Sequence, residues 1–104
     1  MILSLKPGVK LDGLTPQMAL GVFIVASVFW QFRATCTVTS ANDGKHKEGS
    51  KHYSNEAFDI RIRNIRGPLV SQARGWRDRL KSALGKDYDI VLEVDHLHAE
   101  FDPK

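Results

Sequence analysis

The sequence has one cysteine, no long hydrophobic segment and no internal repeat. A lone Cys36 excludes both a disulfide-stabilised scaffold and a zinc finger with cysteine ligands. The most apolar segment, Met18–Trp30, is 13 residues long, whereas a membrane-spanning helix needs about 20. We therefore expect no stable membrane span, and interpret this segment as part of a buried helix rather than a signal anchor. The lack of a period of about 20 to 50 residues excludes a solenoid.

The composition is that of one globular domain over residues 1–104. Of the 104 residues, 42% are hydrophobic and 26% are charged, a mixture that argues against disorder. The formal net charge is +3 at pH 7. This excess suits an anionic partner such as nucleic acid, anionic lipid or bacterial cell wall, but it is also an ordinary value for a soluble protein. Charge alone does not choose among these partners.

Hydrophobic spacing predicts two helices and four strands. The first helix covers residues 16–32, with Thr15 as its N-cap and Pro16 at its first position. The second covers Leu69–Leu84 and ends before Gly85. Alternating or β-branched residues predict strands at Ala34–Ser40, Ala57–Arg63 and Tyr88–Glu93, and from Asp95 or His96 to Phe101. The last two strands are close enough to form a hairpin, so we predict an α+β fold with a small, mainly antiparallel sheet.

All four histidines lie in two short segments that also carry carboxylates: His46 and His52 precede Asp59, while Glu93 and Asp95 precede His96 and His98. In a strand, His96 and His98 would point to the same face. Histidine and aspartate ligands with one open position describe a catalytic zinc site, and a nearby carboxylate then accepts a proton from water. The alternatives are chance clustering of the histidines and a salt bridge from Asp59 to Arg61 or Arg63.

Two motifs carry a family resemblance. The segment Ser50–Asp59, SKHYSNEAFD, follows the pattern S-x-H-x-x-G-x-A-x-D except that asparagine stands at the glycine position. The segment Glu93–His98, EVDHLH, places an acidic residue three positions before a histidine. Both motifs resemble those of the zinc D-Ala-D-Ala carboxypeptidase and L-Ala-D-Glu endopeptidase family, whose metal-site architecture the hedgehog signalling domain shares. The short chain is similar in size to bacteriophage endopeptidases of the endolysin type. The resemblance implies a hedgehog-like or D-Ala-D-Ala peptidase-like α+β fold.

The resemblance also implies a zinc site and a general base. Carried over position by position, it makes His52, Asp59 and His98 the zinc ligands. Asp95, three residues before His98, becomes the general base. The choice of His98 follows family members with an H-x-H pair, in which the second histidine is usually the ligand.

A second frame fits the same pattern. Glu93 lies three residues before His96, so Glu93 is the rival base and His96 the rival ligand. In the preferred frame, His96 and His46 would orient water or stabilise the oxyanion. Ser50 would hold the loop or a ligand by hydrogen bonding.

Two departures from the family pattern bear on the substrate. Asn55 replaces the family glycine, and asparagine tolerates a left-handed backbone better than other non-glycine residues. Larger members carry S-G-x-R after the first strand, where the arginine binds the substrate carboxylate, but the matching segment Ser40–Asp43 has no arginine. Its absence favours an endopeptidase over a carboxypeptidase. Lys45, Arg61 or Arg63 could replace the missing charge.

The resulting hypothesis is a zinc-dependent peptidoglycan peptidase that hydrolyses an amide bond in stem peptides or cross-links, in a role suited to bacteriophage lysis. The alternative is a hedgehog-like binding module that binds metal but is catalytically inactive. A third reading, a nucleic-acid binder, would use the basic side chains of the second helix. It is disfavoured because Trp76 falls on that helix's apolar stripe. A loop with Asp43 and Glu48 could bind calcium by charge alone.

The partners and location follow from this hypothesis. We expect peptidoglycan peptide as the substrate, no nucleic-acid partner and a monomer. The sequence shows no clear signal peptide, so we expect synthesis in the cytoplasm and action on the bacterial cell wall, in the periplasm, after release.

Overall fold

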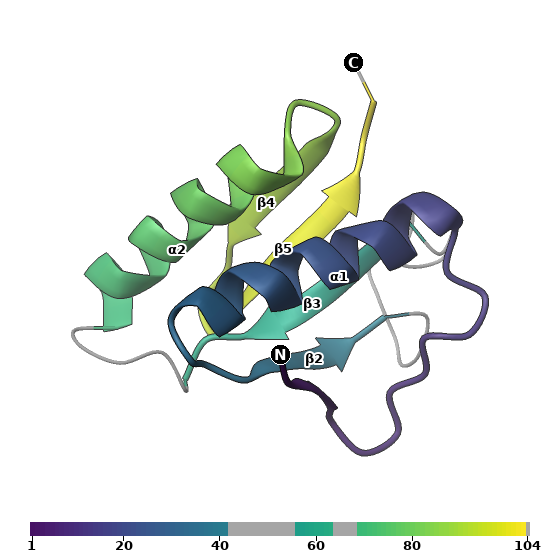
Figure 1. Ribbon diagram of the computed structural model, residues 1–104, viewed down its shortest axis with the longest axis horizontal. Coiled ribbons are helices and arrows are strands. Elements are labelled where there is room, and N and C mark those ends of the chain that lie inside the picture. Colours follow the sequence, from purple (N-terminus) through teal and green to yellow (C-terminus); the bar gives the residue numbers. More distant parts are fainter. Residues whose placement is uncertain (42–55, 64–68, 104) are drawn as a thin grey trace.

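The computed structural model describes residues 1–41, 56–63 and 69–103 of the chain. These ranges contain two helices and a five-stranded, mostly antiparallel sheet, which confirms the predicted α+β class. Both helices lie on the same face of the sheet, so the described residues form two layers (Figure 1). The opposite face of the sheet has no helix over it among the described residues.

Helix α1 (Pro16–Gln31) begins where the sequence predicts. The Thr15 hydroxyl accepts a hydrogen bond from the Met18 N–H at 3.3 Å, and proline occupies the first turn, where its missing N–H is not needed. Residues at three- and four-residue steps face the sheet and are almost fully buried, among them Met18, Val22, Val25 and Phe29. Neither described helix is long and apolar enough to cross a membrane.

The sheet has the strand order β1-β2-β3-β5-β4. Its strands are β1 (Leu3–Leu5), β2 (Cys36–Ser40), β3 (Ala57–Arg61), β4 (Tyr88–Leu92) and β5 (His96–Phe101). The last four confirm the predicted strands with slightly shorter bounds, and β4 and β5 pair as the predicted antiparallel hairpin. Strand β1 pairs in parallel with β2 and was not predicted, because three residues are too few to show alternation. The order brings β3 beside β5, although a helix and a strand separate them in the chain.

Helix α2 (Leu69–Leu84) has the predicted bounds. Its Leu80 is fully buried, and the Trp76 ring lies 4.3 Å from the Phe29 ring, centroid to centroid. Trp76 therefore packs between the helices, as the apolar stripe predicts. Gly85 follows the helix with a φ of +89°, a left-handed conformation that glycine adopts without strain and that commonly ends helices.

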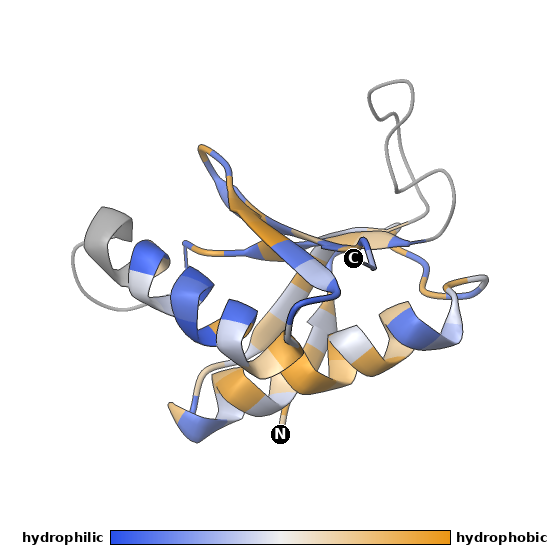
Figure 2. Cartoon of the chain, turned by 90° about the horizontal axis from the view of Figure 1, so that it is seen from above, coloured by the Kyte–Doolittle hydropathy of each residue, from blue (hydrophilic) through white to orange (hydrophobic). Residues whose placement is uncertain are grey.

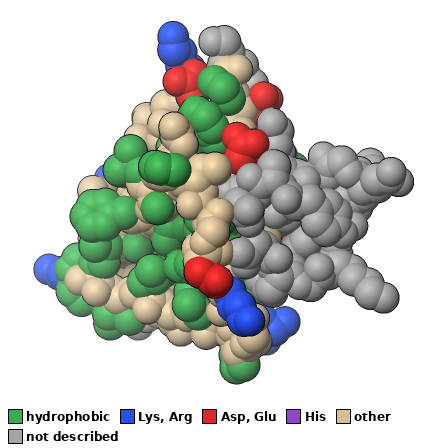
Figure 3. Space-filling model, turned by 90° about the vertical axis from the view of Figure 1, so that its right-hand side faces the viewer, with side chains coloured by type: hydrophobic (Ala, Val, Ile, Leu, Met, Phe, Trp, Pro, Cys, Tyr) green, Lys and Arg blue, Asp and Glu red, His purple; other side chains and the backbone are tan. Residues whose placement is uncertain are grey.

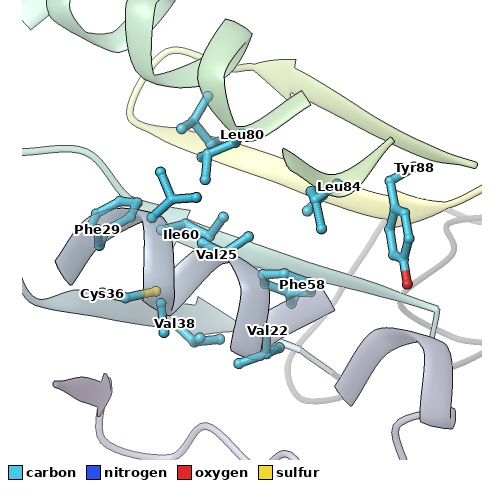
Figure 4. Close-up of a cluster of buried hydrophobic side chains, with 14 of the residues drawn as sticks. Val22, Val25, Phe29, Cys36, Val38, Phe58, Ile60, Leu80, Leu84 and Tyr88 are labelled. Carbon is cyan, nitrogen blue, oxygen red and sulfur yellow. The ribbon is translucent and has the colours of Figure 1, made fainter. Parts of the chain in front are cut away.

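One hydrophobic core fills the space between the helices and the sheet (Figure 4). Phe29 and Val25 of α1 meet Ile60 and Phe58 of β3 there, and all four side chains are fully buried. Cys36 is also fully buried, and this burial raises the pKa of its thiol to about 12. The thiol is therefore protonated at neutral pH and behaves as an inert core side chain.

Apolar side chains also reach the surface along α1. Leu20 and Phe23 are more than half exposed, and a cavity of about 430 Å³ lies between α1 and the N-terminal segment. Figure 3 views the molecule from the right-hand side of Figure 1 and shows many hydrophobic side chains on the described part of that surface. Figure 2 shows the helices below the sheet, with the β4–β5 hairpin rising on the other side. The apolar surface along α1 therefore lies on the helix side of the sheet, opposite the face that carries Asp59 and His98.

Candidate metal centre

The candidate site lies on the face of the sheet that points away from the helices. Strand residues alternate between faces, so burial of Phe58 and Ile60 in the core directs Asp59 and Arg61 to the opposite face. In the same way, burial of Leu97 and Ala99 in β5 directs three side chains to that face: His96, His98 and Glu100. The register then pairs Asp59 with His98 and Arg61 with His96.

Asp59 contacts both histidines of the second motif. Its Oδ1 lies 2.9 Å from His98 Nδ1, and its Oδ2 lies 3.6 Å from His96 Nε2. The Asp59 side chain is only 12% exposed, compared with 16% for His98 and 30% for His96. The sequence left open a salt bridge from Asp59 to Arg61 or Arg63. In the structure, Asp59 contacts the two histidines of the second motif.

His98 lies between two carboxylates. Its Nδ1 faces Asp59, and its Nε2 lies 3.0 Å from Glu100 Oε1. The hydrogen bond to Asp59 is the main cause that raises the pKa of His98. Burial opposes this shift, and Glu100 adds a smaller increase. In the metal-free protein, this raised pKa widens the pH range in which His98 is an imidazolium, the form that can donate one N–H to each carboxylate.

Asp95 and His96 form a pair at the tip of the β4–β5 hairpin. Asp95 Oδ1 lies 2.6 Å from His96 Nδ1, and this hydrogen bond is the main cause that lowers the pKa of Asp95. The Asp95 side chain is 85% exposed. The result is an ionised, accessible carboxylate held beside the histidine that approaches Asp59.

The remaining predicted residues divide into two groups. Glu93 is exposed, and its backbone N–H donates to the His96 carbonyl at 2.9 Å, which closes the hairpin turn. Its carboxylate makes no hydrogen bond or ion pair with another described residue. His46, Ser50 and His52 lie outside the described residues, as does the Asp43 and Glu48 loop. Of the three predicted zinc ligands, the structure therefore places Asp59 and His98, and it places them in contact.

The two distances from Asp59 can be compared with a zinc site. Ligands about 2.0 to 2.2 Å from a tetrahedral zinc ion lie about 3.3 to 3.5 Å apart. The separations of 2.9 Å to His98 and 3.6 Å to His96 lie on either side of this range. One carboxylate with imidazole nitrogens is also a donor set that zinc prefers. Asp59 and His98 therefore offer donor types that zinc accepts, at a separation a few tenths of an ångström shorter than between two ligands of a tetrahedral site.

A carboxylate cluster that the sequence does not predict lies next to His98. One oxygen each from Asp89, Glu100 and Asp102 lies within 4.8 Å of the others; among the described residues, no other group of three potential ligands meets this distance. Asp89 and Glu100 are cross-strand partners, a pairing that the sequence alone could not show. Such a cluster could hold a metal ion, and an all-oxygen donor set is the kind that Ca²⁺ or Mg²⁺ prefers.

The distances between ligand atoms can be compared in the same way for Asp59 and the two histidines of the second motif. One ligand atom each from Asp59, His96 and His98 do not all lie within 4.8 Å of one another, and Asp59 approaches each histidine through a different oxygen. In this geometry, one ion beside Asp59 would contact one of the two histidines and not the other. The arrangement is compatible with either of the two predicted frames.

Comparison with models of known protein families gave no match for this chain, and comparison with curated protein sequences gave none either.

Proposed function

We propose that this protein is a zinc metallopeptidase that hydrolyses an amide bond in the peptides of peptidoglycan. The observation that carries the proposal is the 2.9 Å contact between Asp59 and His98. These residues end two separate motifs, and the motif resemblance requires both to bind one ion. Their meeting across β3 and β5 supports that resemblance independently of the sequence pattern.

The proposed ligands are His52, Asp59 and His98, of which His52 lies outside the described residues. His98 would use the nitrogen that faces Asp59, while Glu100 accepts a hydrogen bond from its other nitrogen. A carboxylate on the far side of a ligating imidazole fixes the ring orientation and makes the ligand more basic. Glu100 is therefore the proposed positioning residue for His98.

Bound zinc would polarise the scissile carbonyl and lower the pKa of a water molecule to about 7. Asp95 would accept the proton of that water and return it to the leaving amine. The hydrogen bond from His96 suits this role, because it keeps Asp95 ionised and fixes its position. Glu93 remains the rival base, in the frame in which His96 is the ligand.

Digestion of purified peptidoglycan, with the products identified by mass, tests this proposal. The wild-type protein loaded with zinc should release fragments cut at one amide bond, and chelation should stop the reaction. Asp95→Asn should reduce the rate by about 10²- to 10⁴-fold, because it removes the general base. It should leave the zinc content unchanged.

Glu93→Gln is the matched variant, because it removes a neighbouring carboxylate from the same hairpin. Loss of activity with Glu93→Gln and not with Asp95→Asn would move the base to Glu93 and the ligand to His96. A protein that binds zinc but cuts no amide bond in peptidoglycan would contradict the peptidase proposal. That outcome would favour the inactive, hedgehog-like binding module.

A further inference from the structure

Helix α1 exposes apolar side chains on the side that turns away from the sheet. Leu20 and Phe23 are 56% and 57% exposed. Ser27 follows one turn later, and its hydroxyl donates a hydrogen bond to the Phe23 carbonyl at 2.9 Å, so this polar group is satisfied within the helix. The outer side of a helix on a globular protein is normally polar. The outer side of α1 therefore has the composition of a contact surface.

The N-terminal segment extends this apolar side of the molecule. Leu3 and Leu5 of β1 pair with Cys36 and Val38 of β2, which are buried in the core, so both leucines point to the helix side of the sheet. Each leucine is 42% exposed. We call these two leucines, the two exposed side chains of α1 and the cavity of about 430 Å³ between the segments the α1 surface. The described residues that line the cavity are all apolar. An exposed apolar area of this kind marks contact with a protein or a membrane.

Cationic side chains border the α1 surface where the helix ends. The Arg33 guanidinium lies 4.7 Å from the centre of the Trp30 ring, and the Arg79 guanidinium of α2 lies 5.0 Å from that of Phe32. Trp30 follows Phe23 by two helical turns and so lies on the same side of α1. Phe32 is 55% exposed. Aromatic rings and cations at the margin of an apolar surface are typical of proteins that contact the headgroup region of a bilayer.

Arg33 occupies a position where the backbone favours glycine. Its φ is +56°, and its N–H donates to the Trp30 carbonyl at 2.9 Å, while the Ala34 N–H donates to the Phe29 carbonyl at 3.0 Å. This pair of hydrogen bonds commonly ends a helix with a left-handed residue, which is usually glycine. An arginine side chain meets a steric cost there that glycine avoids. The turn itself therefore does not need the arginine, whose cation lies beside Trp30.

The charge around the α1 surface also indicates its partner. Residues 13–32 contain no charged side chain, and Lys10 and Arg33 flank them together with one acid, Asp12. Lys10 is exposed and directly precedes Leu11, a lining residue of the cavity. An uncharged helix bordered by cations complements a bilayer with anionic headgroups, because the acyl region accepts apolar side chains and the headgroups attract the cations. A second copy of the chain is a poorer occupant, because it would bring like charges together.

The length of α1 and its place in the fold decide how it would meet a bilayer. Its 16 residues rise about 24 Å, which is less than the hydrocarbon thickness of about 30 Å. Its inner side is also buried against the sheet. The helix would therefore lie along the bilayer surface. Figure 2 shows both helices on one side of the sheet, and Asp59 and His98 lie on the opposite face.

We propose that the α1 surface docks on a lipid bilayer with anionic headgroups. Leu20 and Phe23 enter the edge of the acyl region, while Trp30 and Arg33 lie among the headgroups. Docking through this side directs the candidate metal centre away from the bilayer. The docking stands independently of catalysis, but its use rests on the proposed function: the metal centre would then face peptidoglycan beside the membrane.

Co-sedimentation of the full chain with lipid vesicles tests the docking. Vesicles of equimolar phosphatidylglycerol and phosphatidylcholine are compared with vesicles of phosphatidylcholine alone. Each cation near an anionic surface contributes about 5-fold in affinity. We therefore expect binding to the anionic vesicles to be about 10-fold tighter or more, and to weaken as salt is added.

Two substitutions separate the apolar and the cationic contributions. Phe23→Ser should weaken binding to both kinds of vesicle by about 10-fold, because the exposed ring no longer enters the acyl region. Arg33→Gly should weaken binding to the anionic vesicles by about 5-fold and leave binding to phosphatidylcholine unchanged. Glycine suits the left-handed backbone at this position, so the variant should fold like the wild type.

Matched controls lie away from the α1 surface. Val94 is fully exposed in the turn between β4 and β5, and Arg63 is exposed beyond the end of β3. Val94→Ser removes an apolar side chain and Arg63→Gln removes a cation, and both variants should bind vesicles like the wild type. Losses equal to those of Phe23→Ser and Arg33→Gly would overturn the proposal, because binding would not be located on α1.

Three further outcomes are decisive. A wild-type protein that does not sediment with anionic vesicles would overturn the docking. Dimers formed without lipid in analytical ultracentrifugation, and abolished by Phe23→Ser, would overturn it in favour of a second copy. Vesicle binding by a protein that cuts no peptidoglycan would support the docking and remove only the peptidase function, whereas cleavage without vesicle binding would remove only the docking.

Discussion

Replacing Glu100 tests whether the surroundings of His98 are arranged to hold a metal ion. Glu100 accepts a hydrogen bond from the His98 nitrogen that points away from Asp59, at 3.0 Å. Loss of such an outer carboxylate typically lowers metal affinity by about 10- to 100-fold. This corresponds to about 1.4 to 2.7 kcal/mol of binding free energy. We therefore expect Glu100→Ala to bind zinc with a dissociation constant raised by this factor.

The measurement is a competition titration against a chromogenic zinc chelator at constant pH. Glu100→Gln should lose less affinity than Glu100→Ala, because the amide oxygen still accepts the hydrogen bond but carries no charge. Asp78→Ala removes a carboxylate that is 72% exposed on α2 and should leave the zinc affinity unchanged. A Glu100→Ala protein that binds zinc within about twofold of wild type would refute the positioning role. If Glu100→Ala instead weakens Ca²⁺ or Mg²⁺ binding alone, the relevant site is the cluster with Asp89 and Asp102.

Three further predictions concern the core and the proton on His98. Leu80→Ala should lower the free energy of unfolding by about 2 to 5 kcal/mol in urea titrations, because the side chain is fully buried. Leu20→Ala, at a site 56% exposed, should change it by less than about 1 kcal/mol, and equal losses would contradict the core assignment. Cys36 should react with a thiol reagent only after unfolding, because it is buried and its pKa is raised to about 12; rapid labelling of the native protein would be inconsistent with this packing. Folding raises the pKa of His98 above its ordinary value of about 6.5, so protonated His98 should stabilise the metal-free protein. This contribution to the unfolding free energy should be complete below about pH 6.5 and should disappear as the pH rises through the raised pKa. Asp59→Asn should reduce this change of unfolding free energy with pH. An unchanged pH dependence would show that Asp59 does not raise the pKa of His98.

The sequence predicted most of the fold because its local signals agree with its packing. The threonine–proline pair marks the start of α1, and the apolar steps of α2 include Trp76, which packs on Phe29. In contrast, β1 has only three residues and exists because it pairs with β2, a partner more than thirty residues away. Such a short strand has no local pattern that a sequence could reveal.

The candidate site was predictable in its residue types but not in its contacts. The motifs named Asp59 and His98, and the alternation of β5 placed His96 and His98 on one face. The cross-strand register decides which side chains touch, and a shift of one residue would have moved Asp59 into the core. For this reason the contact between Asp59 and His98 emerged only from the pairing of β3 with β5. Glu100 lies two residues after His98 on the same strand, so alternation along β5 already places these two side chains on one face.

The zinc content of the purified protein tests the central claim most directly. After zinc is supplied and the excess removed, elemental analysis should find about one zinc ion per chain, the stoichiometry of a mononuclear catalytic site. His98→Ala should abolish binding and His96→Ala should retain it; the reverse result would assign His96 as the ligand and Glu93 as the base. A wild-type protein that holds no zinc under these conditions would contradict the metallopeptidase account.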